Sequence, residues 1–300
     1  MAYPAMMRLV AENALCGIAT ADNNPEVAAL FAAQAQALDA AYCRLTAKTF
    51  KQQLSAWISE TQPDVVFVMT FPWRIPASVY SLPRLGFLNF HYGLLPQMRG
   101  ADPIFEAIRQ QHTVAGTTVH VIDEGLDTGP IVAREEIPVN AEMTYGMLSA
   151  QCAYLGEKMC LAMVTDLKAG KPLATVAQDE SQAKYWPKVG AEVLAIRWDD
   201  MDSTTIKALV KSCNPIAKGV PITINNWKIG LCEVMEVNLD GNTANIKPGT
   251  IIVNDVPNGL IVYCKDGKGL RLEVVYTEEG YFPGYKLSFF GINAGMILTS

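Results

Sequence analysis

The stretch LNFHYGLLPQMRG, residues 88–100, begins as an apolar run typical of a buried strand and ends in a turn. Asn89 and His91 stand two positions apart at the end of that run, so a strand directs both side chains to the same face. In open α/β sheets, ligands bind beyond the carboxyl ends of the strands. On this spacing alone, a functional pair and a hydrogen-bonded structural pair are equally compatible with the sequence.

The segments on either side alternate between strand and helix patterns, which predicts an α/β domain with a doubly wound, mainly parallel sheet. The run DVVFVMTF, residues 64–71, is β-branched and aromatic, as expected of a parallel strand buried on both faces. The other predicted strands are 15–20, 41–45, 116–123 and 131–139, and the predicted helices are 3–12, 25–39, 47–59, 103–110 and 145–169.

The pattern changes after a polar segment that contains Pro187. One helix is followed by short strands with turn signals such as Asn225-Asn226 and Asp266-Gly267. This predicts a small antiparallel β-barrel of OB-like type. We therefore expect a catalytic domain over residues 1–180, a linker over 181–199 and the barrel domain over 200–300.

Composition excludes several classes of protein. Half of the 300 residues are hydrophobic, but no apolar run reaches the roughly 18 residues that cross a membrane, and no signal-peptide pattern opens the chain. The cysteines number seven, with no C-x-x-C pair, which argues against a disulfide framework or a structural zinc site. We expect a cytoplasmic protein without a bound metal. The net charge of −6 weakens a nucleic-acid interpretation.

The loop DEGLDTG, residues 123–129, supplies a carboxylate that could complete a site. A capped acidic turn is the usual meaning of such a cluster. If Asp127 reaches His91, however, it would orient the imidazole and stabilise its charged form. Asn89 would then donate to a developing oxyanion while His91 moves a proton. The other histidines, His112 and His120, are expected to be surface and structural residues.

The segments LNFHYGLLPQMRGADPIFEAI and GTTVHVIDEGLDTGPIV closely resemble the N10-formyltetrahydrofolate-dependent formyltransferases. The C-terminal half resembles the barrel domain of that family through YWPK, IRWDD, CNP, PGTII and LRLEVV. The resemblance implies a Rossmann-like catalytic domain and catalytic roles for Asn89, His91 and Asp127. It also implies N10-formyltetrahydrofolate as co-substrate.

The same resemblance implies folate contacts in three segments. Gly93 stands where the family usually has serine, so the hydroxyl is absent there, while backbone contacts can persist. Trp73 is expected either to wall the pterin pocket or to be a packed aromatic residue. The implied folate-binding residues are Trp73, Ile75, Gly93, Leu94, Leu95, Pro96, Asp123 and Gly125.

The acceptor is expected to be a primary amine on a small molecule, a sugar nucleotide or a carrier protein. Methionyl-tRNA is the alternative acceptor. It comes second because the family's tRNA-specific member carries a long basic loop after its second strand, which this sequence lacks. Here residues 17–45 contain one basic residue, Arg44, so tRNA is possible but disfavoured. A formyltetrahydrofolate hydrolase is a second alternative.

Two other classes fit the sequence less well. A non-catalytic binder of the same fold would not need Asn89, His91 and Asp127 together. A dinucleotide-dependent dehydrogenase would carry G-x-G-x-x-G after a strand, and no such motif is present.

The order of elements also predicts a gap in the sheet. The first predicted element is helix 3–12, whereas the family begins with a strand that lies between the strands at 15–20 and 64–71. We expect the native protein to begin roughly ten residues upstream, with a strand and a short loop. The alternative is that another segment fills this position.

Overall fold

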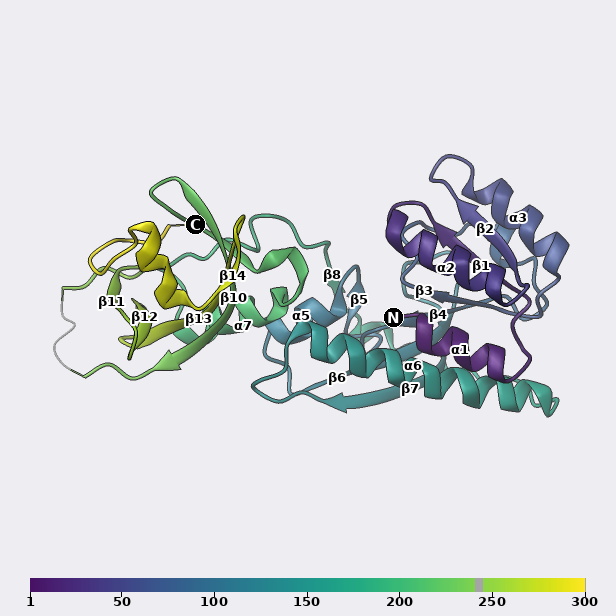
Figure 1. The fold of residues 1–300 in the computed structure, drawn as a ribbon. Helices are drawn as coiled ribbons and strands as arrows, with labels where there is room; N and C mark the ends of the chain where they lie inside the picture. The colour runs from purple at the N-terminus through teal and green to yellow at the C-terminus, as the bar shows by residue number, and fades with distance from the viewer. Residues whose placement is uncertain (241–244, 300) are drawn as a thin grey trace. The chain divides into compact units, whose positions relative to one another are not determined.

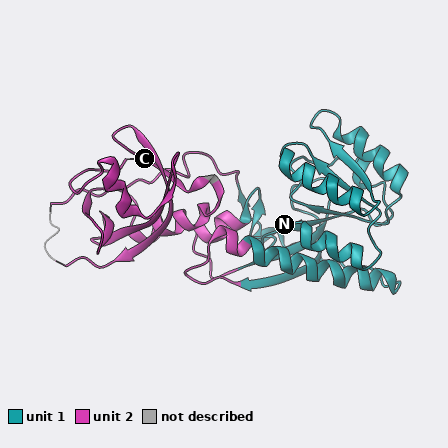
Figure 2. Cartoon of the chain, in the orientation of Figure 1, with its two compact units in different colours: residues 1–103, 115–137, 149–186 teal, residues 104–114, 138–148, 187–300 magenta. Residues whose placement is uncertain are grey.

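The computed structural model describes residues 1–240 and 245–299. The chain divides into two compact units (Figure 2). The N-terminal unit contains residues 1–103, 115–137 and 149–186, and the C-terminal unit contains residues 104–114, 138–148 and 187–300. The predicted boundaries at 180 and 200 stay a prediction.

Helices and strands alternate in the first part of the chain, as the sequence pattern predicts (Figure 1). The 24-residue helix α6 follows the last long strand of this part. In chain order the elements are α1 Tyr3–Ala11, β1 Gly17–Ala21, α2 Pro25–Ala37, β2 Ala41–Leu45, α3 Phe50–Thr61, β3 Val66–Met69, α4 Ala77–Tyr80, β4 Phe87–His91, β5 Arg99–Gly100, α5 Pro103–Arg109, β6 Val114–Val121, β7 Ile131–Pro138, α6 Tyr145–Lys168, η1 Glu180–Gln182 and β8 Tyr185–Trp186.

The main sheet of the N-terminal unit is split in two. One sheet pairs β1 with β2 in parallel, and the other has the order β3-β4-β6-β7. Strand β3 runs parallel to β4, but β6 runs antiparallel to β4, so the larger sheet is mixed. The parallel pairs confirm the α/β class, while the predicted single, mainly parallel sheet is interrupted between β1 and β3.

Side-chain packing holds each half of this unit together. Helix α3 buries one face, because Leu54, Trp57 and Ile58 follow helical spacing. These residues form a cluster with Phe87 of β4. Helix α3 therefore packs against the start of strand β4, and this packing positions the carboxyl end of the strand.

The C-terminal unit is built on an antiparallel sheet with the order β11-β12-β13-β10-β9, and β14 pairs with β13. Asp202 caps α7 by accepting a hydrogen bond from Thr205 N at 2.7 Å. The elements are α7 Ser203–Cys213, η2 Ile216–Lys218, β9 Val220–Ile224, β10 Trp227–Val237, β11 Ile251–Asp255, β12 Gly259–Tyr263, β13 Gly269–Thr277, β14 Gly280–Phe282 and η3 Gly284–Phe290.

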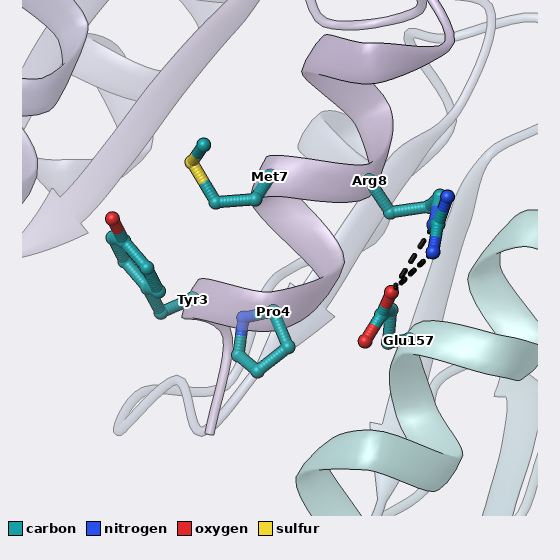
Figure 3. Close-up of a pocket in the computed structure, with 5 residues that line it drawn as sticks. All are labelled: Tyr3, Pro4, Met7, Arg8 and Glu157. Carbon is teal, nitrogen blue, oxygen red and sulfur yellow. Dashed lines mark hydrogen bonds and ion pairs between the residues drawn. The ribbon is translucent and has the colours of Figure 1, made fainter.

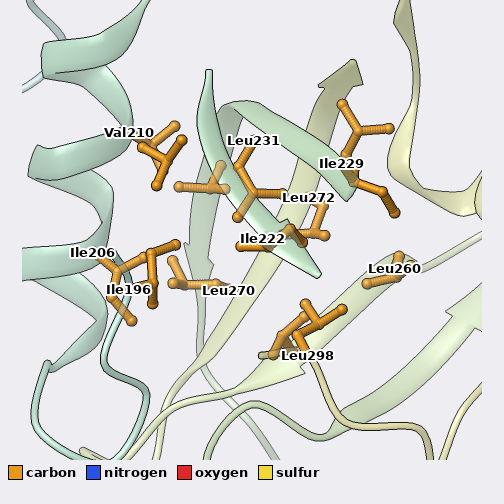
Figure 4. Packing of buried hydrophobic residues seen from close by; sticks show 14 of the residues in the cluster. Ile196, Ile206, Val210, Ile222, Ile229, Leu231, Leu260, Leu270, Leu272 and Leu298 are labelled. Carbon is orange, nitrogen blue, oxygen red and sulfur yellow. The ribbon is translucent and has the colours of Figure 1, made fainter. Parts of the chain in front are cut away.

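The end of the chain closes this sheet. Thr299 exchanges backbone hydrogen bonds with Thr223 of β9, and Ile251 N of β11 donates to the carbonyl of Met296 at 2.8 Å. The segment 296–299 thus joins the two outer strands, which confirms the predicted barrel. Its interior is apolar and packs Ile206 and Val210 of α7 against Leu231, Leu270 and other strand residues (Figure 4).

The seven cysteines are free thiols in the structure. In the described parts of the chain, no helix is both long and apolar enough to traverse a lipid bilayer.

Candidate active site

Strand β4 places Asn89 and His91 at its carboxyl end, as the sequence predicts. His91 is buried, with 6% of its surface exposed, and Asn89 is partly buried. Phe87, Leu88 and Phe90 anchor the strand, since each is about 1% exposed. The chain has no freedom here to turn the polar pair away from its shared face.

Both ring nitrogens of His91 have neighbours. Nε2 lies 2.5 Å from the carbonyl oxygen of Met98, to which it donates when it carries the proton. Nδ1 lies 3.6 Å from Oδ1 of Asp127. Burial lowers the pKa of His91 below its ordinary value, and the Asp127 carboxylate and the Met98 carbonyl oppose this only in part. His91 is therefore neutral at pH 7.

Asp127 is brought to His91 by the loop that follows β6. Its backbone adopts a left-handed conformation with φ +57°, and its Oδ2 accepts a hydrogen bond from Gly100 N at 3.0 Å. Burial by itself raises the pKa of Asp127, but His120, His91 and the Gly100 N–H outweigh it, so the net pKa lies below the ordinary value. Asp127 is thus a buried, ionised carboxylate at neutral pH.

His120 is a member of the site, although its place in an alternating strand predicted a structural role. The antiparallel register of β4 and β6 sets His120 directly opposite Asn89. Nδ2 of Asn89 lies 3.1 Å from Nε2 of His120, and that Nε2 lies 3.6 Å from Oδ1 of Asp127. Nδ1 of His120 lies 2.9 Å from the Val121 carbonyl, to which it can donate. The signal that could have found His120 was its place on a strand beside β4.

The turn after β4 is tied to β6 by Thr118. Its hydroxyl donates to the carbonyl of Gly93 at 2.7 Å and accepts from Leu95 N at 3.1 Å. A β-carbon on Gly93 would lie 2.6 Å from Cβ of Pro103 and 3.0 Å from Nε2 of His91. A side chain at this position would therefore press on Pro103 and His91. This close packing is consistent with glycine at position 93.

The remaining predicted folate-binding residues lie in different environments. Trp73 is partly buried and packs against Phe50 and Phe71, with ring centroids 5.1 and 5.3 Å apart. Ile75 is buried in the same cluster. Leu95 is fully buried and Leu94 is partly buried.

Asp123 and Gly125 shape the loop that carries Asp127. Oδ1 of Asp123 accepts hydrogen bonds from Gly125 N at 3.0 Å and from the Thr128 hydroxyl at 2.6 Å. This is the capped turn that the residue types favour. It fixes the loop conformation that delivers Asp127 to the site.

Gln178, which follows α6 in the chain, forms hydrogen bonds with the backbone of the same loop. Nε2 of Gln178 donates to the carbonyls of Asp127 and Gly129, at 2.9 and 2.7 Å. Oε1 of Gln178 accepts from Arg99, a buried residue that also forms an ion pair with Glu180 at 2.6 Å. Gln178 and Arg99 thus connect the backbone of Asp127 to the chain around Gly100, a contribution that the sequence pattern does not predict.

Among the described residues, no group of three His, Cys, Asp or Glu side chains has the geometry of a metal site. Two cavities of the N-terminal unit lie away from Asn89, His91 and Asp127. A small one of about 340 Å³ is lined by Tyr3, Pro4, Met7, Arg8 and Glu157 (Figure 3). A larger one of about 950 Å³ lies between β1 and β3.

This arrangement suits acyl transfer without a covalent intermediate. An amide donor, a neutral imidazole and an ionised carboxylate converge at one strand end. They can polarise a carbonyl, accept a proton and stabilise the resulting imidazolium, in that order.

Comparison with known proteins identifies relatives of this chain. A family model described as formyl transferase matches residues 8–164, and one described as formyl transferase, C-terminal domain, matches residues 188–280. A methionyl-tRNA formyltransferase of Aromatoleum aromaticum is 32% identical over 71% of this chain and 65% of its own length. That of Carboxydothermus hydrogenoformans is 30% identical over 79% of this chain and 74% of its own length.

Solved structures share the fold at lower identity. HypX from Aquifex aeolicus, in complex with tetrahydrofolic acid, superposes with a TM-score of 0.63 at 15% identity, covering 85% of this chain and 43% of its own. An N-formyltransferase from Helicobacter canadensis, in complex with folinic acid and dTDP-3-aminofucose, has a TM-score of 0.56 at 15% identity, covering 85% of this chain and 98% of its own.

Proposed function

Because the chain belongs to the formyl transferase family, we propose that it transfers a formyl group from N10-formyltetrahydrofolate to a primary amine. The observation that supports this most strongly is the convergence of Asn89, His91 and Asp127, with His91 Nδ1 3.6 Å from Asp127 Oδ1. The family match over residues 8–164 contains all three residues.

In the proposed reaction the amine nitrogen attacks the formyl carbon, and a C–N bond forms. Asn89 donates an N–H to the carbonyl oxygen as negative charge develops there. His91, neutral because burial lowers its pKa, accepts the proton that the amine loses and returns it to N10 of the folate as the N10–C bond breaks. Asp127 stabilises the transient imidazolium.

The geometry sets one condition on the proton transfer. Nε2 of His91 is engaged by the carbonyl of Met98, and Nδ1 faces Asp127. His91 can receive a proton at Nε2 only if Nδ1 carries the other hydrogen and the contact with Met98 opens. We propose that substrate entry displaces this contact.

For the folate we propose the three segments that carry the family resemblance. The turn from Gly93 to Pro96 would contribute backbone groups, which Thr118 already holds in place. Trp73 and Ile75 would supply apolar surface. Asp123 and Gly125 would contribute through the shape of their loop, since two hydrogen bonds already engage Oδ1 of Asp123.

For the acceptor we propose the α-amine of methionyl-tRNA. Relatives at about 30% identity carry that name, and both family models match this chain. This reverses the order inferred from the sequence alone, in which a small-molecule, sugar-nucleotide or carrier-tethered amine came first. That class remains the second candidate, because residues 17–45 hold one basic residue and the net charge is −6.

A competition among acceptors tests this order. We expect kcat/KM for methionyl-tRNA to exceed that for amino sugars and free amines, as measured by transfer of labelled formyl. We expect few phosphates of the tRNA to be neutralised by basic residues. Each neutralised phosphate contributes about −0.9 to the slope of log affinity against log salt concentration, so we expect a shallow slope of roughly −2 to −3. Faster formylation of an amino sugar nucleotide would overturn our choice of acceptor. Release of free formate without an acceptor would instead indicate the hydrolase.

A conservative change at Gln178 should slow the reaction without removing a reacting group. Gln178→Glu keeps an acceptor for Arg99 but loses the two N–H donors to the carbonyls of Asp127 and Gly129. We expect kcat to fall by about 10-fold to 100-fold, because small displacements of a catalytic group have costs of this order. Gln182→Glu, on the exposed side of the same segment, is the matched control and should leave kcat unchanged. Equal kcat values for both variants would show that Gln178 does not position Asp127.

A further inference from the structure

The neutral ring of His120 has a defined tautomer, because its two nitrogens face different groups. Nδ1 lies 2.9 Å from the carbonyl oxygen of Val121. A carbonyl oxygen only accepts hydrogen bonds, so Nδ1 carries the single ring proton and donates it to this oxygen. Nε2 is then left with a lone pair, and in this state it can only accept a hydrogen bond.

The acceptor at Nε2 of His120 sets the orientation of the Asn89 amide. Nδ2 of Asn89 lies 3.1 Å from this nitrogen, a distance that suits a donated N–H. If the amide were turned around, its oxygen would meet the lone pair of Nε2 and the hydrogen bond would be lost. His120 thus distinguishes the two ends of the amide, which are nearly equal in shape but opposite in hydrogen-bonding character.

This orientation leaves one N–H of Asn89 for a substrate. An amide nitrogen carries two N–H groups. Over residues 1–240 and 245–299, the contact with His120 is the only side-chain hydrogen bond of Asn89. His120 is buried, with 3% of its surface exposed, whereas Asn89 is partly buried at the carboxyl end of β4. The second N–H is therefore the donor that can meet the formyl oxygen.

A second proton on His120 would reverse this arrangement. The ionisable groups that face its ring are His91 on β4, with ring centroids 6.4 Å apart, and Asp127, whose Oδ1 lies 3.6 Å from Nε2. A proton on Nε2 would be attracted by the Asp127 carboxylate, but it would also face the N–H of Asn89, so that two donors oppose each other. The amide would have to turn its oxygen towards His120, and this turn moves both of its N–H groups.

We propose that His120 is a positioning residue for Asn89, which in its neutral form directs the free N–H of the amide to the formyl oxygen and on protonation withdraws it. The inference rests on the proposed formyl transfer and concerns the same site. The reaction then needs two neutral imidazoles, His91 to accept the proton of the amine and His120 to orient the amide. Both imidazoles face Asp127, so their ionisations are coupled. We therefore expect two ionisations on the acidic side of the pH profile.

Two substitutions separate orientation from charge. His120→Leu removes the acceptor, and we expect kcat to fall by about 10-fold to 100-fold because the amide is no longer held. His120→Gln places an oxygen acceptor near the position of Nε2 but takes up no proton, so it should recover most of kcat. On the acidic side, the slope of log kcat/KM against pH should approach about 2 for the unchanged chain and about 1 for His120→Gln. His112→Gln, between α5 and β6, is the matched control and should keep the slope of the unchanged chain.

Nuclear magnetic resonance of the unchanged chain gives a readout that does not depend on catalysis. Couplings between ring nitrogens and ring protons, measured at a pH above the acidic limb, should place the proton of His120 on Nδ1. As the pH is lowered, the side-chain amide signals of Asn89 should shift together with the protonation of His120. Circular dichroism and melting temperature should show that the variants at position 120 are folded.

Three results would overturn the proposal. The first is a proton on Nε2 of neutral His120, because that nitrogen would then not accept from Asn89. The second is a kcat for His120→Leu equal to that of the unchanged chain. The third is an acidic slope that is the same for His120→Gln and the unchanged chain. If the unchanged chain formylated no amine, the proposed function would fail, whereas the tautomer of His120 and the response of the Asn89 amide would still test this inference.

Discussion

Replacing His91 with alanine is expected to lower kcat for formyl transfer by about 10²-fold to 10³-fold, the usual contribution of a positioned general base. The side chain is buried at the end of β4, and no other imidazole can take its place. His120 lies across the sheet with its Nε2 against Asn89. The amine would have to lose its proton to water, while the substrates still bind.

The matched control is His112→Ala, which removes a partly buried imidazole between α5 and β6. Circular dichroism and melting temperature should show that both variants are folded. If His91→Ala retained a rate near that of the unchanged chain, His91 would not be the base. If only KM rose, His91 would bind substrate without moving a proton.

Asp127→Asn is expected to lower kcat by about 10²-fold to 10³-fold while the shape of the loop is retained. An asparagine oxygen can still accept from Gly100 N, which donates to Oδ2 of Asp127 at 3.0 Å. What is lost is the negative charge that stabilises protonated His91. Glu124→Gln removes a charge from an exposed side chain of the same loop without changing the carboxylate beside His91, so it is the matched control.

The pH dependence of this variant has a definite sign. Asp127 raises the pKa of His91 and so works against the lowering caused by burial. Without that charge, the pKa of His91 falls further, and a lower pH is needed to protonate the base. The acidic limb of the kcat/KM profile is expected below the ordinary histidine pKa for the unchanged chain, and it should move to still lower pH in this variant. An unmoved limb would leave Asp127 as a loop residue only.

Local patterns predicted much of the candidate site. Asn89 and His91 share a face because a strand alternates, and Asp127 follows the next long strand in a glycine-rich loop. Helical spacing correctly predicted α3 with Leu54, Trp57 and Ile58 buried. Patterns of this kind depend on a few neighbouring residues, so they are visible without knowledge of the fold.

The missed features depend on pairing between distant segments. His120 joins the site because β6 runs antiparallel to β4, whereas the alternation of strands and helices favoured a parallel neighbour. Gln178 lies in a polar segment without periodicity, and it acquires its role only where that segment passes the Asp127 loop. Neither contact leaves a local trace in the sequence.

The order of elements did predict the interruption in the sheet. The predicted order of helices and strands left an open position between residues 15–20 and 64–71. The structure shows α1 at Tyr3–Ala11 and no pairing between β1 and β3.

A single-turnover assay with N10-formyltetrahydrofolate and methionyl-tRNA, with amino sugar nucleotides as parallel acceptors, decides whether the chain transfers the formyl group to an amine. Product is identified by mass as a formylated amine, and His91→Ala serves as the catalytically impaired control. We expect stoichiometric appearance of formylated amine and tetrahydrofolate, at a rate at least about 100-fold above that control. Formation of tetrahydrofolate and formate with every acceptor left unmodified would contradict formyl transfer to an amine.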